Sequence, residues 1–324
     1  MGKLKGYVGI CYHYIRQPLL LEFPGILGTS VADFYEHTEM LSNNYQVISP
    51  KEALQFSYGE FSLDDTGVLI TFDDGLSDHY LAASILAERN IKALFFIPTC
   101  ILVDDMPANS TILHYCLQKY RIAGFLEACK WALIDLVVGN NLRYQTFNVI
   151  YKKGTTDPWE IIAEIKEAFK YKLNYRESRD ILLWIYKNWF LKDYPEALSM
   201  MHLTKEQISS MLEMGHSIGT HTHTHISMAA THLDSLDFRK ELIAPKDYLE
   251  RTFDTSVKAF SYPFGQNQDC FRSEELLNKT NKYELAFTVE RILNKRTTCP
   301  LELGRHTVTG GDTAVDLNRQ IKCI

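Results

Sequence analysis

The chain has 324 residues, of which 46% are hydrophobic and 23% are charged, a composition typical of a globular protein that can bury a sizeable core. Its formal charge of −6 at pH 7 argues against a nucleic-acid partner, because binding to phosphate backbones needs a dense basic surface. The 7 cysteines are scattered and never form the close pairs of zinc fingers or redox motifs, so we expect reduced thiols.

The N-terminal segment does not have the form of a signal peptide, since Tyr12, His13 and Arg16 interrupt its apolar run. No stretch reaches the roughly 18 to 20 apolar residues that a membrane-spanning helix needs. We therefore expect a cytoplasmic protein without a transmembrane segment. The sequence is compatible with an oligomer but offers no support for one.

Short apolar segments alternate with amphipathic segments along most of the chain. Strands are expected in residues 7–15, 45–49, 67–74, 91–99, 216–220, 257–265, 283–289 and 303–310. Helices are expected in residues 30–44, where Ser30 is the N-cap, in 49–56 and 78–90, in 204–214, where Thr204 and Gln207 form a capping box, and in 235–253 and 273–282. This alternation predicts parallel strands with helices outside them.

Residues 101–200 interrupt the alternation, because they show strong helical periodicity and few strand signals. We predict an α/β fold in which residues 1–100 and 201–324 form a distorted (β/α) barrel of seven or eight strands and residues 101–200 form a helical insertion. Sites in such barrels lie at the C-terminal ends of the strands. His13, the pair Asp73 and Asp74, and a histidine cluster all follow predicted strands at that end.

The cluster contains four of the chain's 11 histidines, His216, His221, His223 and His225. An extended strand would place His221, His223 and His225 on one face, whereas a helical turn would pair only His221 with His225. Either geometry brings His221 and His225 together. Two imidazoles and one carboxylate are a common open metal site, which leaves a position for a water whose pKa the metal lowers. His216 precedes a strand, and we expect a structural role for it.

Asp73 and Asp74 are adjacent carboxylates that directly follow a buried apolar strand. Neighbouring residues on a strand point to opposite faces, so the two need not share a role. An Asp-Gly pair after a strand is also common turn chemistry, and on its own that structural role would be preferred. The histidine cluster favours a chemical role instead. His79, at the start of the next predicted helix, is expected to be exposed.

The segments TFDDG at 71–75 and GHSIGTHTHTH at 215–225 resemble the first two motifs of the polysaccharide deacetylases, the NodB-homology group of carbohydrate esterase family four. The resemblance extends to YHY near the N-terminus, FFIPT, FSYPFG at 260–265 and LGRHTV near the C-terminus. It therefore covers most of the chain outside the predicted insertion.

This resemblance implies that Asp74, His221 and His225 bind a divalent metal, usually zinc. Asp73 would then be the general base that takes a proton from the water activated by the metal. The metal would polarise the amide carbonyl, and a backbone N–H near residues 262–265 would help to hold the oxyanion. An acid must then protonate the departing amine.

The sequence departs from the family pattern at two places. The third family motif often begins with an arginine that orients the base, but Ser261 stands there, and we expect Arg305 to compensate or else to form an ordinary salt bridge. The late histidine motif is not evident either. His306 and His13 are the candidates for the acid, and His306 ranks first because of its position near the C-terminus.

The residues Tyr262, Pro263 and Phe264 either line a sugar subsite, since aromatic rings stack on sugar faces, or pack in the core. The resemblance implies a hydrolase that removes an acyl group, in the first place N-acetyl, from an amino sugar or an oligosaccharide precursor. A formyl group or an O-acetyl ester would be removed by the same chemistry. The alternative is a catalytically degenerate member that binds carbohydrate without turnover, suggested by the missing arginine and the unassigned acid.

Overall fold

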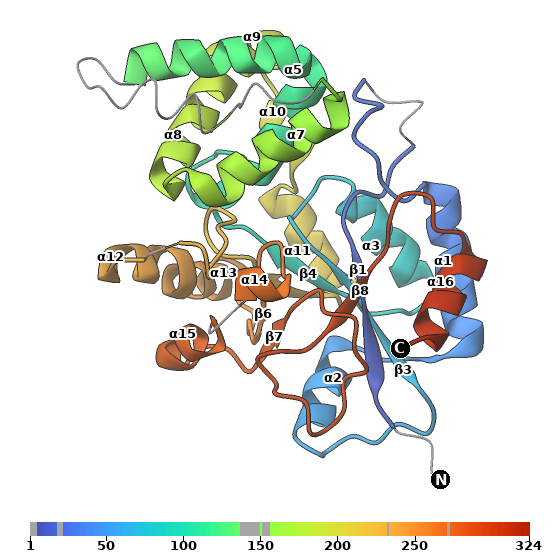
Figure 1. The fold of residues 1–324 in the computed structure, drawn as a ribbon. Helices are drawn as coiled ribbons and strands as arrows, with labels where there is room; N and C mark the ends of the chain where they lie inside the picture. The colour runs from blue at the N-terminus through green and yellow to red at the C-terminus, as the bar shows by residue number, and fades with distance from the viewer. Residues whose placement is uncertain (1–4, 18–21, 137–149, 151–155, 232, 271–272) are drawn as a thin grey trace.

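The computed structural model describes residues 5–17, 22–136, 150, 156–231, 233–270 and 273–324. Figure 1 shows two parts, a barrel of strands surrounded by helices and a group of helices that stands over one end of it. No helix in the described ranges is both long enough and apolar enough to cross a membrane.

The barrel is built from parallel strands. They are β1 (Tyr7–Tyr12), β2 (Gln46–Val47), β3 (Gly67–Phe72), β4 (Leu94–Ile97), β5 (Ser217–Thr220), β6 (Ala259–Ser261), β7 (Leu285–Phe287) and β8 (Arg305–Thr307). Their order is β7-β6-β5-β4-β3-β1-β8, and β2 pairs with β3 outside this path. A bridge between Phe287 and Leu303, just before β8, nearly closes the ring. The expected distorted (β/α) barrel is therefore confirmed.

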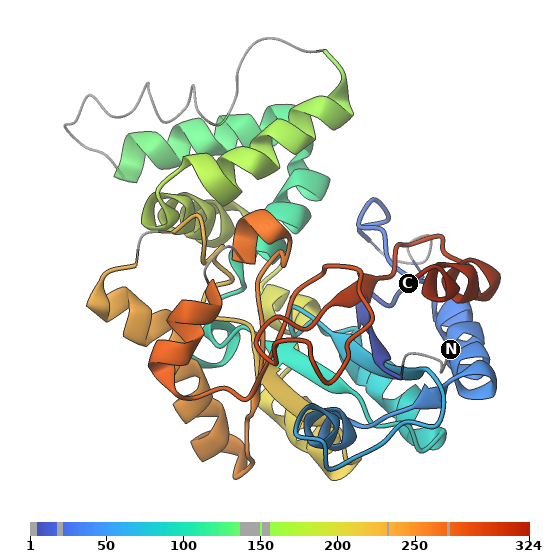
Figure 2. The same ribbon diagram turned by 60° about the horizontal axis from the view of Figure 1, so that its bottom comes forward.

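Helices cover the outside of this barrel. They are α1 (Val31–Asn44), α2 (Pro50–Ser57), α3 (His79–Glu88), α11 (Lys205–Glu213), α12 (Ser235–Phe238), α13 (Ala244–Phe253), α14 (Asn267–Cys270), α15 (Ser273–Thr280) and α16 (Ala314–Lys322), and the π-helical turn η4 (Arg239–Ile243) joins α12 to α13. Ser30 caps α1, and Thr204 and Gln207 form the predicted capping box of α11. Figures 1 and 2 both show α16 lying beside α1.

Strand alternation divides the apolar side chains between two sides of the sheet. Phe95 on β4 packs in a cluster with residues of the outer helices such as Ala82, and its ring stacks on Phe72 with centroids 4.5 Å apart. The next residue, Phe96, belongs to a different cluster with Phe287. The barrel thus has an apolar interior as well as an apolar layer beneath its helices.

The helices over the barrel end lie between β4 and β5 in the chain. They are α4 (Cys100–Val103), α5 (Asn109–Leu136), α7 (Pro158–Glu167), η2 (Ala168–Lys172), α8 (Tyr175–Ile185), η3 (Tyr186–Phe190), α9 (Leu191–Asp193) and α10 (Ala197–Met201). They leave the barrel directly after the C-terminal end of β4. Their apolar cluster includes Tyr14, Phe23 and Leu76 from the barrel segments, so the two parts share a core.

A buried glutamate anchors the loop that follows β5. Glu241 on η4 is only 2% exposed. Its carboxylate accepts the backbone N–H groups of His223 at 3.0 Å and Thr224 at 2.9 Å, and the Thr224 hydroxyl at 2.8 Å. The loop carrying the histidine cluster is therefore held by one side chain from the helical layer.

Replacing Glu241 with alanine is expected to lower the free energy of unfolding by about 3 kcal/mol, because it leaves two buried N–H donors without an acceptor. Urea denaturation followed by circular dichroism would measure this change. Glu302→Ala removes an exposed glutamate as the control and should change stability by less than about 0.5 kcal/mol. Equal stability of the two variants would contradict the anchoring role.

Candidate active site

Three buried side chains converge where β3 and β5 end. The Oδ1 atom of Asp74 lies 3.0 Å from Nε2 of His225 and 3.4 Å from Nε2 of His221. One ligand atom from each residue lies within 4.8 Å of the other two, a spacing that could hold a metal ion. The three residue types are those of an open zinc site with two imidazoles and a carboxylate.

The backbone adopts unusual conformations at this place. The φ angles are 78° at Asp74, 58° at Thr222 and 64° at His225, all in the left-handed region. Each such residue costs about 1–3 kcal/mol, and such strain is typical of functional sites. The segment 221–225 is neither the extended strand nor the helical turn considered from the sequence. It is a strained loop, yet it brings His221 and His225 together, with ring centroids 4.7 Å apart.

Hydrogen bonding prepares His221 for a metal. Its Nδ1 lies 2.8 Å from the carbonyl oxygen of Ser261, so Nδ1 carries a proton and Nε2 is the ring atom that faces Asp74. In the described part of the chain, the buried Oδ1 of Asp74 has no hydrogen-bond partner. Burial by itself would raise the pKa of Asp74, but the neighbouring His225 and His221 hold it well below its usual range. A buried carboxylate oxygen that faces the Nε2 atoms of two imidazoles, at 3.0 and 3.4 Å, fits a cation.

The two remaining histidines of the cluster point elsewhere. The ring of His223 lies 2.9 Å from the Thr99 hydroxyl and 3.0 Å from a carboxylate oxygen of Asp104. The ring of His216 is within hydrogen-bond distance of the carbonyl of Ala83 and the N–H of Ala93. Both rings therefore connect segments of the fold and do not contribute to the group around Asp74.

Asp73 is held by a buried arginine. Arg305 donates from Nη1 to Oδ1 and from Nη2 to Oδ2 of Asp73, both at 2.7 Å, and it is fully buried. The Ser261 hydroxyl also donates to Asp73, at 3.1 Å. Burial by itself would raise the pKa of Asp73, but Arg305 and then His221 hold it well below its usual range. The carboxylate is thus ionised and fixed in orientation by an arginine from β8.

The two candidate acids lie in different places. His13 lines the same pocket as Asp74 and His225, and one of its ring nitrogens lies within 4.8 Å of ligand atoms of Cys11 and Asp73. His306 follows Arg305 on β8 and therefore faces the other way, with Nε2 2.8 Å from the side-chain oxygen of Gln320 on α16. The structure brings His13 to the site and places His306 away from it.

The expectation that His79 is exposed is wrong. It is fully buried at the first turn of α3, and its Nε2 donates to the carbonyl oxygen of His13 at 3.0 Å. Its ring lies 5.1 Å from that of Phe72. Since the first residue of α3 faces the strands and not the solvent, His79 supports the segment that carries His13.

The three residues after Ser261 divide between the two roles considered for them. Tyr262 is 1% exposed and donates to the carbonyl of Leu301, which places it in the core, and Pro263 is also buried. Phe264 lines the pocket, and its ring meets that of His225 edge-on with centroids 4.7 Å apart. Only Phe264 is available to a ligand.

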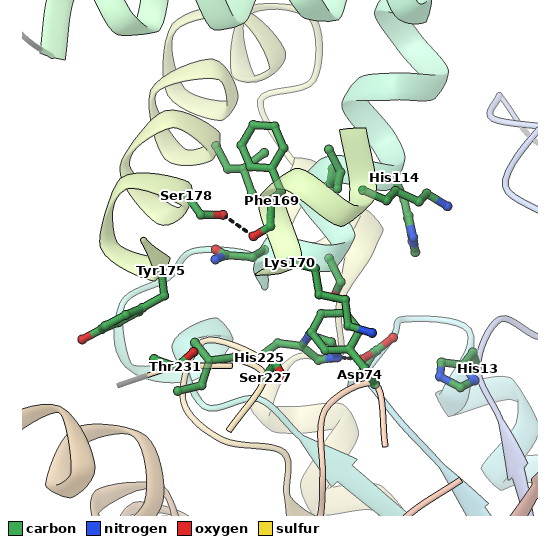
Figure 3. Close-up of a pocket in the computed structure, with 17 residues that line it drawn as sticks. His13, Asp74, His114, Phe169, Lys170, Tyr175, Ser178, His225, Ser227 and Thr231 are labelled. Atoms are coloured by element: carbon green, nitrogen blue, oxygen red, sulfur yellow. Dashed lines mark hydrogen bonds and ion pairs between the residues drawn. The ribbon is translucent and has the colours of Figure 1, made fainter. Parts of the chain in front are cut away.

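The site opens into a pocket of about 330 Å³ between the barrel and the helices above it. Figure 3 shows His13, Asp74 and His225 on the barrel side, with His114 and Lys170 extending toward them from the helices above and Phe169 among those helices. Sequence analysis missed the latter three residues. Helical periodicity indicates that a helix has a buried face, but it does not say that this face covers a site on distant strands.

A family model described as "Polysaccharide deacetylase" matches residues 182–287. This range contains both metal-site histidines and the segment 260–265, while the carboxylates Asp73 and Asp74 lie before it. No curated protein matches the chain.

Several solved structures share the fold. A Streptococcus pyogenes deacetylase, PplD, solved in complex with acetate, is 16% identical, with 98% of this chain and 99% of that chain covered and a TM-score of 0.58. IcaB from Ammonifex degensii is 18% identical, with 98% and 97% covered and a TM-score of 0.57. A de-N-acetylase from Aggregatibacter actinomycetemcomitans is 14% identical, with 98% and 99% covered and a TM-score of 0.53. At these identities the likeness establishes the fold.

The family match adds to the motifs at 71–75 and 215–225, and the shared barrel agrees with both. The resemblance found in the sequence is therefore confirmed: residues 182–287 match the model of the polysaccharide deacetylases, whose members are hydrolases, and the whole chain shares the fold of solved deacetylases.

Proposed function

We propose that this chain is a metal-dependent hydrolase that removes an N-acyl group, in the first place N-acetyl, from an amino sugar. The observation that carries this proposal is the arrangement of two carboxylates. Asp74 faces two imidazoles in a geometry suited to a cation, while its neighbour Asp73 is held ionised by Arg305 beside the same pocket. Acyl hydrolysis needs an electrophilic centre and a base next to one another.

Asp74, His221 and His225 would hold the metal, and zinc suits this donor set best. The bound metal supplies a Lewis acid that polarises the acyl carbonyl and lowers the pKa of a water. The Nδ1–H bond from His221 to the Ser261 carbonyl fixes the ring so that Nε2 is the donor.

Asp73 would act as the general base that accepts a proton from the attacking water. Arg305 keeps it ionised and holds both of its oxygens, so the carboxylate is unprotonated and fixed in one orientation beside the pocket. The missing arginine of the third motif was one of two reasons, with the unassigned acid, to consider a carbohydrate-binding member without turnover. The double hydrogen bond from Arg305 removes that reason, and we prefer catalysis.

His13 would donate the proton to the departing amine, because it lines the pocket beside Asp74 while His306 is bonded to Gln320 on the far side of β8. Its backbone carbonyl is tied to His79, which restrains the position of the ring. The substrate class remains a precursor sugar or oligosaccharide. Formyl and O-acetyl groups would undergo the same reaction, and a cytoplasmic location remains a prediction.

The first test of this proposal is metal binding. Zinc at about 100 times its dissociation constant should raise the free energy of unfolding of the wild type by about 2.7 kcal/mol, since only the folded chain presents the three ligands together. Asp74→Asn and His221→Ala should lose both this stabilisation and the bound zinc measured by atomic emission. His306→Gln, which alters a histidine outside the site, should keep both. Full zinc occupancy in Asp74→Asn would refute the ligand set.

The second test concerns the base and its arginine. Release of acetate and formate from a panel of N-acylated amino sugars should fall roughly 10²- to 10⁴-fold in Asp73→Asn, the range that general-base catalysis contributes. Arg305→Lys keeps the positive charge but cannot make two parallel bonds, and we expect at least a roughly tenfold loss of kcat. Zinc content should be unchanged in both variants. An unchanged rate in Asp73→Asn would exclude it as the base.

The third test separates the candidate acids. His13→Ala should lower kcat by roughly 10²-fold or more, whereas His306→Ala should change it less than about twofold. Steady-state rates with the substrate found in the panel would measure both. A larger loss of kcat in His306→Ala than in His13→Ala would contradict this assignment and favour His306 as the acid, as the sequence suggested.

A further inference from the structure

The roof of the pocket comes from the helices between β4 and β5. Residues from that part line the cavity opposite the metal-site residues, and they include His114, Lys166, Phe169 and Lys170. Figure 3 shows Lys170 extending from the roof toward Asp74 and His225. Whatever enters the pocket therefore contacts the barrel with one side and these helices with the other.

Lys166 and Lys170 lie four residues apart on the continuous helical run formed by α7 and η2. This spacing places both on one face, which is the face that lines the pocket. Two ammonium groups side by side repel each other unless an anion lies near them.

Lys170 already has a fixed position. Its Nζ lies 3.2 Å from Oδ2 of the fully buried Asp269 and 3.9 Å above the ring of Phe264. Asp269 also accepts the hydroxyl groups of Tyr171 and Ser227. The ammonium group is thus held between the roof and the barrel beside the aromatic ring that borders the metal site.

Lys166 is different, because no carboxylate in the described ranges lies within ion-pair distance of it. The pocket itself offers none. Of the described residues that line it, only Asp74 is a carboxylate, and that group faces His221 and His225. Burial lowers the pKa of His114 to about 3, so this neighbour is a neutral ring and adds no charge. Burial lowers the pKa of Lys166 from its ordinary value, as it does for an ammonium group without a counter-ion, so an anion in the pocket would pair with Lys166 and stabilise its charge.

The charged residues that the helices contribute to the pocket lining are both lysines, whereas the whole molecule has a formal charge of −6. A cavity of about 330 Å³ is near the lower end of the range for small-molecule sites, roughly 300–1,000 Å³. It suits one sugar with a substituent better than a long stretch of polymer.

We propose that the lysine pair Lys166 and Lys170 binds a phosphate group carried by the amino sugar, so that the preferred substrate is a phosphate-bearing N-acyl amino sugar. Lys166 would pair with the phosphate directly, and Lys170 would add a second donor while remaining tied to Asp269. This inference rests on the proposed deacylation for the identity of the sugar, but the anion site stands on the geometry of the roof.

Binding can be measured without turnover in the Asp73→Asn background. Isothermal titration calorimetry would compare N-acetylglucosamine with N-acetylglucosamine 1-phosphate. We expect the phosphate to improve the affinity roughly tenfold or more, as a charge-assisted contact does, and Lys166→Met to abolish that gain. Lys166→Arg should restore it. The matched control Lys187→Met, which alters an exposed lysine of η3 outside the pocket, should leave it unchanged.

The same titration with a UDP-linked and a polyprenyl-diphosphate-linked amino sugar in detergent distinguishes the sources of the phosphate. If one of the phosphate-bearing sugars binds more tightly than the neutral sugar and Lys166→Met loses this difference, the lysine site is supported. The sugar that binds most tightly then shows which kind of phosphate carrier the site prefers. Equal affinity for the neutral sugar and all phosphorylated sugars would contradict the phosphate site at Lys166 and Lys170. A preference for phosphorylated sugars that persists in Lys166→Met would also contradict it.

Acyl release is then measured with Asp73 intact. This measurement distinguishes a failure of the proposed phosphate site from a failure of the proposed deacylation. No acyl release from any sugar, together with a Lys166-dependent phosphate preference in binding, would overturn the deacylation and support the anion site. Release from neutral and phosphorylated sugars with equal kcat/KM would support deacylation and overturn the lysine site.

Discussion

The structure of the site depends on one buried ion pair, that between Arg305 on β8 and Asp73 after β3. Burying both charges is costly unless every donor is satisfied, and here all of them are. Besides its two bonds to Asp73, the guanidinium donates to the Thr288 carbonyl and to the hydroxyls of Thr71 and Ser261. The pair therefore connects four segments of the barrel around one planar group.

The surrounding residues make room for this group. A Cβ atom at Gly9 on β1 would lie 2.6 Å from Cγ of Arg305, so any larger residue there would displace the arginine. Ser261 is small enough to let the guanidinium pass and polar enough to bond it. The position that often holds an arginine in the family is thus occupied by a residue that accommodates an arginine from another strand. A guanidinium group therefore bonds Asp73 in this chain, although it comes from β8.

The sequence predicted the barrel well because strand and helix periods differ and because caps such as Ser30 and Thr204 mark helix starts. It overestimated the strands. The segment 257–265 yields only the three-residue β6 (Ala259–Ser261), and further along it Phe264 and Gly265 have positive φ, which an extended strand cannot contain. It also missed α16, although Thr313 and Asp316 form a capping box before it.

Prediction of the site succeeded where ligands are close together in the chain and failed where the fold alone brings them together. His221 and His225 are four residues apart, so almost any local geometry pairs them. The choice between His13 and His306 depends on which face of a strand each occupies, and Arg305 takes the inward face of β8 and thereby turns His306 outward. Lys166 and Lys170 could not be assigned at all, because nothing local indicates what a helix face covers.

The two sides of the pocket carry different charges, because one side is formed by the barrel and the other by the helices between β4 and β5. In the barrel part of the site, Arg305 balances the charge of Asp73, and Asp74 with its two imidazoles would hold the proposed cation. The roof contributes ammonium groups, so the side of the pocket away from the metal ligands is the positive one. In the proposed reaction a neutral amide becomes a cationic amine and a carboxylate, and the new ammonium charge would be repelled by Lys166. The phosphate stays on the sugar after the amide is cleaved, so Lys166 would hold the product through its phosphate while repelling its new ammonium group.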